Sequence, residues 1–314
     1  RVRTPEYSQE AKYLRDKLGL ALIINPELEA AIEMAHILHL PSSLEVTNFA
    51  HGQAQLIKYE IPEGSILDGT KLMDLGTRHH ANILIGAVER DDEVTIPSGD
   101  FVLRKGDKLS FVGERRHTKE FFSHIGVNTH SVKNTLIIGG GKAAYYLAKQ
   151  LISRGIKVKI IENSFERCEE LSILLPDAVI INGDGTEQAL LKEEGIETCQ
   201  SFVPLTGIDE ENIMLTLYAK QVSNAKVITK LNRITFTNVI NSLDLGSVIS
   251  PKYITSEAII AYVRAKKNSM NCNIETLYHM YDSRVEAIEF FVSENSNVTD
   301  IPLRDLKLKK HLLI

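Results

Sequence analysis

The chain has 314 residues, of which 43% are hydrophobic and 25% charged, and its formal net charge of -5 accompanies a pI of about 6.1. This balance is typical of a soluble globular protein of two or three domains, and it excludes a disordered, collagenous or strongly basic nucleic-acid-binding chain. The three cysteines, Cys168, Cys199 and Cys272, form no Cys-x-x-Cys pair, so we expect a reducing compartment and no metal site. The sequence has no apolar run long enough to span a membrane and no signal-peptide pattern.

Residues 51–130 predict a small α+β module. Short apolar runs predict strands over 55–60, 83–88, 93–96 and 109–112, and residues 118–125 predict a closing helix. Asp91 and Asp92 separate the second strand from the third, and such a pair is typical of a tight turn.

Residues 131–265 alternate β-branched runs with stretches of helical periodicity. Strands are expected over 135–138, 158–161, 178–181, 201–205 and 226–231. Helices are expected over 142–154, 163–175, 184–194 and 209–223. Because parallel strands need crossover connections of about this length, the segment predicts a doubly wound parallel sheet of the Rossmann type.

Two internal repeats extend this organisation to both ends of the sequence. Residues 18–26 match residues 243–251, and residues 1–7 resemble residues 230–236, so residues 1–50 are expected to be the tail of another Rossmann-type domain. Residues 54–59, 72–75 and 80–83 match residues 285–290, 303–306 and 311–314 in one register, so residues 266–314 are expected to begin a second small module. The predicted fold class is therefore α/β, internally duplicated. Because the chain begins at Arg1 rather than Met, we expect it to be part of a longer protein.

One glycine-rich string carries the candidate chemistry. Gly139, Gly140 and Gly141 are followed by Lys142, Ala143 and Ala144, which fits the pattern G-x-G-x-x-A between a predicted strand and a predicted helix. The first glycine allows the tight turn, the third removes a Cβ from the path of a pyrophosphate, and the small Ala144 permits close helix packing. The helix start offers backbone N–H groups to an anion.

Polar residues follow the other predicted strands at the edge of the sheet where ligands bind. Glu162 is placed to accept hydrogen bonds from ribose hydroxyls and to repel a 2′-phosphate, which favours NAD or ATP-type ligands over NADP. Asp184 is expected near the adenine or its ribose, and Thr206 and Gly207 near the second phosphate or ribose. Lys230 could contact a phosphate. The alternative is that the two carboxylates only cap helices.

Three functional interpretations stay open on these residues. A nucleotide-binding regulator needs only the glycine loop and its neighbours. An NAD-dependent oxidoreductase also needs an acid/base residue beside the hydride acceptor, and no such residue is evident in the sequence. A structural assembly domain with a degenerate cleft is the third possibility, and Ala144 in place of a third glycine is the feature that favours it.

Several segments together resemble the regulatory RCK (KTN) domains. The matching residues are Leu136–Gly141, Ile161–Glu162, Asn182–Thr186, Leu205–Gly207, Asp209–Asn212 and Ser250–Pro251. The tandem order, with a small β-rich module between the Rossmann-type units, is similar to that of the TrkA family of peripheral subunits of Trk potassium uptake systems. The resemblance covers essentially the whole chain.

This resemblance implies a non-enzymatic regulator that binds NAD(H) and ATP or ADP. The nucleotide site would comprise Gly139, Gly141, Lys142, Ala143, Glu162, Asp184, Thr206 and Lys230, with Arg1 as the counterpart of Lys230 in the first half. Such subunits are cytoplasmic, lie at the inner face of the membrane and form rings beneath a potassium-transporting partner of the TrkH or TrkG type. We further hypothesise that residues 236–243 and the segment Ser250–Pro251 form a hinge and dimer crossover.

Overall fold

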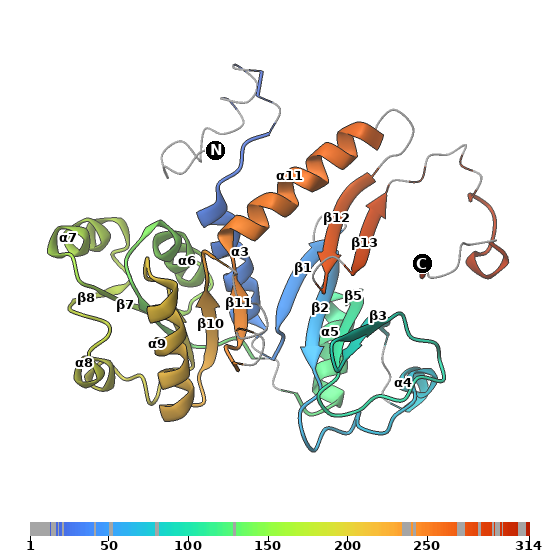
Figure 1. Ribbon diagram of the computed structural model, residues 1–314, viewed down its shortest axis with the longest axis horizontal. Helices are drawn as coiled ribbons and strands as arrows, with labels where there is room; N and C mark the ends of the chain where they lie inside the picture. The colour runs from blue at the N-terminus through green and yellow to red at the C-terminus, as the bar shows by residue number, and fades with distance from the viewer. Residues whose placement is uncertain are drawn as a thin grey trace. The chain divides into compact units, whose positions relative to one another are not determined.

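The computed structural model divides into two compact units (Figure 1). The α/β unit comprises residues 1–41 and 130–256, and the β-sheet unit comprises residues 42–129 and 257–314. The structure describes residues 13, 17, 19–20, 22–40, 42–49, 53–78, 82–127, 130–233, 240, 243–268, 274–281, 284–290, 292, 296, 298–306 and 312–314. Arg1 and most of the predicted 236–243 hinge segment lie outside these residues.

The α/β unit is built on a parallel sheet with the strand order β11-β10-β9-β6-β7-β8. Its strands are β6 (Asn134–Ile138), β7 (Lys157–Glu162), β8 (Val179–Asn182), β9 (Ser201–Pro204), β10 (Lys226–Lys230) and β11 (Ser247–Ile249). In chain order this is the arrangement 3-2-1-4-5-6 of the Rossmann fold, so the predicted doubly wound parallel sheet is confirmed. The order reverses between β6 and β9, and ligands bind beside such a switch point.

The helices of this unit cover the apolar faces of the sheet. They are α6 (Lys142–Ile152), α7 (Phe165–Leu174), α8 (Gln188–Glu193) and α9 (Asp209–Val222). A fifth helix, α3 (Pro26–His39), packs along α6 and shares its core (Figure 1). Small residues on both helices, among them Ala31 and Ala148, are fully buried at this contact, which lets the two backbones approach closely.

The β-sheet unit contains an antiparallel sheet with the order β1-β2-β5-β3-β4. Its elements are β1 (Glu45–Phe49), β2 (Ala54–Glu60), α4 (Leu72–Arg78), β3 (Leu84–Arg90), β4 (Glu93–Thr95), β5 (Lys108–Glu114) and α5 (Arg115–His124). One face of the β2–β5 pair packs under α5, where the Tyr59 ring of β2 meets Phe122 and the Phe111 ring of β5 meets Phe121 and Phe122 edge to face. The α+β module predicted for this segment is confirmed, including a two-residue turn at Asp91 and Asp92, both of which have positive φ.

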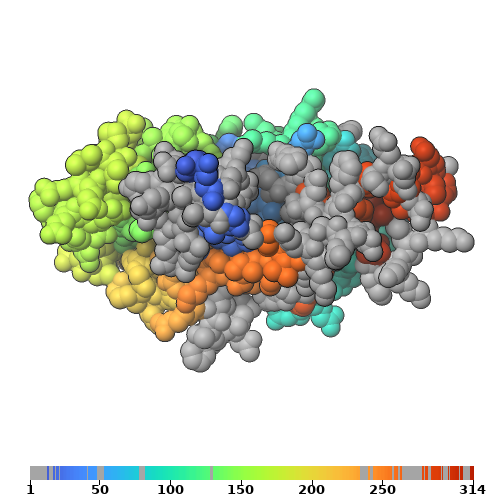
Figure 2. All heavy atoms as spheres, turned by 90° about the horizontal axis from the view of Figure 1, so that it is seen from above, coloured from blue at the N-terminus to red at the C-terminus, as the bar shows by residue number. Residues whose placement is uncertain are grey.

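The C-terminal elements reproduce the internal repeat. They are α11 (Pro251–Asn268), the hairpin β12 (Ile274–Met280) and β13 (Val285–Phe290), and the short 3-10 helix η2 (Leu303–Asp305). Pro26 and Pro251, which match in the repeat, each begin a helix. Figure 2 shows α11, in orange, at the surface, where Ile259 and Val263 are exposed. Their counterparts in α3, Met34 and Leu38, are buried against α6.

The structure also adds elements that the sequence patterns did not predict. Strands β1 and β11 are five and three residues long, and α4 has seven residues. Elements this short carry too few periods for a sequence pattern to indicate them. In the described part of the chain, no helix is long and apolar enough to cross a membrane.

Candidate nucleotide-binding site

The turn between β6 and α6 can be made only by glycine at its first position. Gly139 has a φ of +94°, and a Cβ there would lie 3.1 Å from the Leu205 carbonyl oxygen and 3.2 Å from the Thr206 nitrogen. A side chain would therefore be strained and would also push β6 and β9 apart. Because Gly139 passes so close to the end of β9, the loops that follow β6 and β9 are neighbours at the switch point of the sheet.

The second glycine is held by the carboxylate at the end of β7. The Gly140 N–H donates to Glu162 Oε2 at 2.6 Å, and the Ser164 N–H donates to Glu162 Oε1 at 2.8 Å. Arg167 of α7 donates from Nε to the Gly140 carbonyl oxygen at 2.7 Å. The glycine loop is therefore fixed from two directions, by an anion on its N–H and by a cation on its carbonyl.

The third glycine leaves the start of α6 open. An ideal Cβ on Gly141 would have no atom within 4 Å. Gly141 is the N-cap of α6, makes no side-chain capping bond, and is followed by no acidic residue in the first turn. Lys142 is exposed there and Ala143 is buried. The positive end of the helix dipole thus points at space that neither a capping side chain nor a carboxylate of its own helix fills.

The loop after β8 is held by hydrogen bonds within itself and by one bond to β7. Asp184 Oδ1 accepts bonds from the Thr186 N–H at 2.8 Å and the Thr186 hydroxyl at 2.7 Å, and these bonds lower the pKa of Asp184. The Gly183 N–H donates to the Glu162 carbonyl oxygen at 2.9 Å, which ties this loop to β7. Asp184 makes no capping bond to α8, whose N-cap is Glu187, so the alternative that Asp184 caps this helix is wrong.

The loop after β9 is organised by a buried amide and a lysine. Asn212 Oδ1 accepts bonds from the Thr206 N–H at 3.0 Å and the Thr206 hydroxyl at 2.9 Å, while its Nδ2 donates to the Lys230 carbonyl oxygen at 3.0 Å. Lys230 Nζ donates to the carbonyl oxygens of Thr206, at 2.7 Å, and Leu205, at 3.3 Å. Burial lowers the pKa of Lys230, and the charges of Asp209 and Glu27 oppose this shift.

The structure therefore brings most of the predicted residues to one edge of the sheet. Gly140 bonds Glu162 directly, Lys230 bonds Thr206 directly, and the close approach of Gly139 to Leu205 joins the two groups. Gly207 has no atom within 4 Å of an ideal Cβ, so its side of the loop is open. Asp184 lies in the loop after the neighbouring strand β8 and bonds within that loop.

Two residues that matter to this geometry were missed by sequence reasoning. From the sequence, Asn212 enters only as the last residue of the matching segment Asp209–Asn212, and Arg167 only within the helix expected over 163–175. Asn212 is fully buried, and a polar residue buried inside the first turn of a helix usually has an assigned hydrogen-bonding role. Arg167 could have been found as the cation in the first turn of the helix that directly follows Glu162.

Fold and loop geometry together define a class of protein, one that joins a Rossmann-type domain with a glycine-rich switch-point loop to a small antiparallel module. A family model described as the TrkA-N domain matches residues 135–251, and one described as the TrkA-C domain matches residues 56–126. These ranges correspond to the parallel sheet and to most of the antiparallel sheet. Together with the full-chain relatives described next, these matches show that the chain belongs to the TrkA family.

Curated relatives extend this match over the whole chain. The Trk system potassium uptake protein TrkA homolog 1 of Methanosarcina mazei is 32% identical over 315 residues, which cover 100% of this chain and 68% of the relative. The Trk system potassium uptake protein TrkA of Haemophilus influenzae is 28% identical over 317 residues, which cover 100% of this chain and 68% of that protein.

A solved structure described as the GsuK channel bound to NAD resembles this chain with a TM-score of 0.59 at 18% identity. The match covers 88% of this chain and 49% of the channel chain, so this chain spans about half the length of that channel protein. At this level of identity the likeness shows a shared fold.

Proposed function

We propose that this chain is a nucleotide-binding regulatory subunit of a potassium uptake system. Its membership of the TrkA family supports the potassium-uptake part of this proposal. The observation that carries the nucleotide-binding part is the open start of α6 beside Glu162, at the switch point of a Rossmann-type sheet. A site of this kind offers backbone donors to phosphates and a carboxylate to a ribose.

The residues present fit a dinucleotide or an adenine nucleotide. Phosphate oxygens would be held by backbone N–H groups of Gly141, Lys142 and Ala143, because Gly141 leaves the approach clear. Glu162 uses its two oxygens for the Gly140 and Ser164 N–H groups. A carboxylate accepts about four hydrogen bonds, so Glu162 retains capacity for the ribose hydroxyls.

The remaining predicted residues complete the proposed site from three further segments. Asp184 would contact the adenosine part, and Thr206, Gly207 and Lys230 would lie near the second phosphate or ribose. Arg1 would be the counterpart of Lys230 in a site of the first half. The negative charge of Glu162 disfavours a 2′-phosphate, so we propose NAD(H) and ATP or ADP as the ligands. The bound NAD named for the GsuK channel supports this choice of ligand class.

Regulation would follow from a shift between conformations. A ligand changes an equilibrium only by its difference in affinity for the two states, so NAD(H) and ATP would act differently if they favour different shapes of one cleft. The packing of α3 along α6 provides a path, because α6 carries the proposed phosphate site and α3 belongs to the preceding repeat. We retain residues 236–243 and Ser250–Pro251 as the proposed hinge.

Assembly and location follow from the same family membership. We propose that the chain forms rings with copies of itself at the cytoplasmic face of the membrane and gates a potassium-transporting subunit of the TrkH or TrkG type. The four predicted segments, 1–50, 51–130, 131–265 and 266–314, would be alternating Rossmann-type and small modules. Substitution of Pro251 should then change the shape that nucleotide gives the ring, and a ring geometry that is the same with and without nucleotide would contradict the hinge.

We propose a regulatory rather than a catalytic role. Burial raises the pKa of the Cys168 thiol and raises that of Cys199 to about 11, so both thiols are protonated and weakly nucleophilic at neutral pH. A hydride-transfer assay with NADH and common carbonyl substrates tests this directly. Steady turnover would favour the oxidoreductase interpretation.

Calorimetry on the full chain tests the site. Gly141→Ala should bind NADH and ATP at least about tenfold more weakly, because the new methyl group faces the phosphates and desolvates their donors. The same variant should fold as well as the parent, since Gly141 has a φ of -65° and open space around an ideal Cβ. Glu162→Gln should weaken both ligands by a similar factor, because it removes a charged acceptor.

Gly76→Ala is the matched control, because Gly76 lies in α4 and also has open space around an ideal Cβ. Its nucleotide affinity should equal that of the parent. Unchanged affinity in Gly141→Ala would contradict the proposed site, and no binding by the parent chain would favour a structural role. Potassium flux in vesicles that contain the transporting partner, with NADH or ATP added, then tests the gating.

A further inference from the structure

Thr206, in the loop after β9, directs its polar groups into the protein. Its N–H donates to Asn212 Oδ1 at 3.0 Å, and its carbonyl oxygen accepts bonds from Lys230 Nζ at 2.7 Å and Asn212 Nδ2 at 3.3 Å. Its hydroxyl lies 2.9 Å from Asn212 Oδ1 and 3.1 Å from the Ile208 carbonyl oxygen, and it accepts a bond from the Ile208 N–H at 3.2 Å. A hydroxyl has one hydrogen to donate, so the Thr206 side chain has no donor left for a phosphate.

Asn212 holds this arrangement from the first turns of α9. Its Oδ1 accepts bonds from the N–H and the hydroxyl of Thr206, and its Nδ2 donates to the carbonyl oxygens of Thr206 and Lys230. These four bonds use the full capacity of the amide. The opposite amide orientation would set N–H against N–H and oxygen against two carbonyl oxygens, so one orientation is fixed. Asn212 is fully buried, so water does not compete for these bonds.

The peptide plane after Thr206 turns the Gly207 N–H away from this network. The peptide bonds of the described residues are all trans, and in a planar trans peptide the C=O and N–H groups point in opposite directions. Because the Thr206 carbonyl oxygen faces Lys230 and Asn212, the Gly207 N–H points away from both. Gly207 is exposed, and none of the residues that the structure describes accepts a hydrogen bond from its N–H.

This N–H belongs to a loop beside the glycine turn. Because a Cβ on Gly139 would meet the Leu205 backbone at 3.1 Å, the loop after β9 and the start of α6 border the same switch point. In a Rossmann-type site a pyrophosphate lies at the start of the first helix, and the rest of the ligand continues across the switch point. The Gly207 N–H is therefore an exposed backbone donor on that path.

The acidic residues at the start of α9 leave this donor accessible to an anion. Asp209 accepts bonds from the N–H groups of Asn232 and Arg233, each at 2.8 Å, and from the Asn232 amide at 2.9 Å. Glu210 lies 3.9 Å from the Arg233 guanidinium. Both carboxylates are thus directed to the loop after β10, while Lys230 adds a positive charge to the loop after β9.

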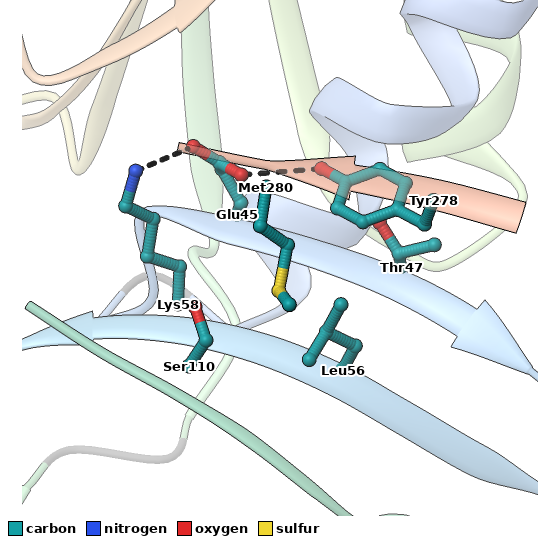
Figure 3. Close-up of a pocket in the computed structure, with 7 residues that line it drawn as sticks. All are labelled: Glu45, Thr47, Leu56, Lys58, Ser110, Tyr278 and Met280. Carbon is teal, nitrogen blue, oxygen red and sulfur yellow. Dashed lines mark hydrogen bonds and ion pairs between the residues drawn. The ribbon is translucent and has the colours of Figure 1, made fainter. Parts of the chain in front are cut away.

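A cavity of the β-sheet unit shows the contrasting case (Figure 3). Glu45 accepts a bond from the Tyr278 hydroxyl at 3.1 Å and pairs with Lys58 at 3.2 Å, so the charged groups that line this cavity bind each other. Leu56 and Met280 line its apolar side. These charged groups need no ligand, whereas the loop after β9 presents a donor that the protein leaves open.

We propose that Asn212 is a positioning residue that aims the Gly207 N–H at the phosphate farther from adenosine in NAD(H) or ATP. The Thr206 hydroxyl is part of this support and does not contact the phosphate. The inference rests on the proposed nucleotide site and assigns roles within it. Because Asn212 and Lys230 fix the Thr206–Gly207 peptide plane before the ligand binds, little conformational entropy is lost when this donor is used.

Calorimetry of the full chain with NADH, ATP and AMP tests this assignment. AMP has a single phosphate and lacks the group that the Gly207 N–H would bind, so it reports on the rest of the site. Thr206→Val removes the hydroxyl at nearly constant shape, and it should weaken NADH and ATP about tenfold but AMP by less than about twofold. Thr206→Ser keeps the hydroxyl and should restore most of the affinity that Thr206→Val loses.

Asn212→Ala should give the same split between ligands, with a loss of at least about tenfold for NADH and ATP. Adding Thr206→Val should then weaken binding by no more than about twofold further, because the hydroxyl acts through Asn212. Asn212→Ser is the second variant should Asn212→Ala not fold.

Thr216→Val is the matched control. The Thr216 hydroxyl lies 2.6 Å from that of Thr229, in a buried pair between α9 and β10 that is four residues beyond Asn212. The variant loses a comparable buried bond of the same helix, so its stability should fall as in Thr206→Val. Its affinities for all three ligands should equal those of the parent.

Hydrogen exchange locates the donor. The Gly207 amide should exchange at least about tenfold more slowly with NADH or ATP bound, and at the ligand-free rate with AMP. An unprotected Gly207 amide with NADH bound would overturn the proposal, and so would equal weakening of AMP in the variants. A Thr206→Val effect that persists undiminished beside Asn212→Ala would make the hydroxyl a ligand contact. No binding of any ligand by the parent would overturn the proposed nucleotide site itself.

Discussion

Two helices that pack side by side in the α/β unit begin in opposite ways. Helix α3 starts with Asn25, whose side chain caps the Leu28 N–H, followed by proline and by Glu27 and Glu29 in the first turn. Helix α6 starts with Gly141, which makes no side-chain capping bond, and continues with Lys142 and no acidic residue in its first turn. The backbone N–H groups at the start of α3 are thus capped by residues of the chain itself. The start of α6 has no such cap, and Lys142 adds a positive charge at the positive end of the helix dipole.

The difference indicates which helix start has a function outside folding. Capping and acidic first turns stabilise a helix by about 0.5–2 kcal/mol, so a buried core helix without them forgoes that stabilisation. At α6 the open start coincides with a glycine turn, a switch point and a carboxylate on the next strand. An anionic ligand would supply there what Asn25, Glu27 and Glu29 supply to α3.

The largest effect is expected where the α6 start meets the sheet. Gly139→Ala should lower the free energy of unfolding by about 2–4 kcal/mol, because φ is +94° and the methyl group would meet the Leu205 backbone at 3.1 Å. Denaturant unfolding measures the loss. Gly141→Ala, two residues away with open space, is the control and should change stability by less than about 1 kcal/mol. Equal losses in both variants would contradict the proposed difference between the two glycines.

An asparagine N-cap like that of α3 can be introduced at the start of α6. Gly141→Asn should raise the free energy of unfolding by a few tenths of a kcal/mol, roughly the difference between asparagine and glycine as N-cap. The same side chain would occupy the donors and lower NADH affinity by about a hundredfold, as expected for lost charge-assisted bonds. Calorimetry and denaturant unfolding on one preparation measure both quantities. Retained affinity together with higher stability would show that ligand does not use these donors.

The sequence predicts a site residue where the local backbone conformation requires that residue type. The positive φ of Gly139 and the open approach to Gly141 leave glycine as the suitable residue, so the pattern was visible at those positions. Glu162 was also predicted, but its bonds to the Gly140 and Ser164 N–H groups depend on how the neighbouring loops fold. Its contact with Ser164 satisfies a backbone donor at the start of α7, so the alternative of a helix-end role for Glu162 applies in part.

Contacts between distant segments were not predictable from local patterns. Asn212 joins the loop after β9 to the end of β10, and Arg167 bonds from α7 to the Gly140 carbonyl oxygen. Neither residue type is required by its own helix, so no local pattern predicts the distant atom that each side chain contacts. The strand β11 was missed for a related reason, because its three residues gain their partners only when β10 lies beside them.

A smaller effect is expected at the capped start. Asn25→Ala should lower the free energy of unfolding by about 1–2 kcal/mol, because it removes both the cap of α3 and a buried 2.9 Å bond from Asn25 Nδ2 to the Tyr146 hydroxyl on α6. Ser164→Ala is the comparator, since it removes an exposed cap from α7 without a bond to another helix. A double-mutant cycle with Tyr146→Phe isolates the link between α3 and α6. Zero coupling energy would remove this bond from the proposed path.

The smallest effect concerns Lys230, whose pKa is influenced by Glu27 in the first turn of α3. Burial lowers the pKa of Lys230 from its usual value, so in the free protein its charged form is disfavoured and stability rises with pH through that range. A phosphate bound nearby would favour the charged form and raise this pKa, so binding would take up a proton. Nucleotide affinity should therefore fall as the pH rises from below the lowered pKa toward 10.5, the usual value.

Two variants separate the contributions to this pH dependence. Lys230→Met should abolish the alkaline fall in affinity, which calorimetry at several pH values measures. Glu27→Gln should move the fall to lower pH by a small amount, because the Glu27 charge in the first turn of α3 opposes the shift caused by burial. An unchanged profile in Lys230→Met would place Lys230 outside the ligand's reach. Lys230 would then have only a structural role, through its bonds to the Thr206 and Leu205 carbonyl oxygens. Ligand binding at the start of α6 would then not be linked to the charge of Glu27 at the start of α3.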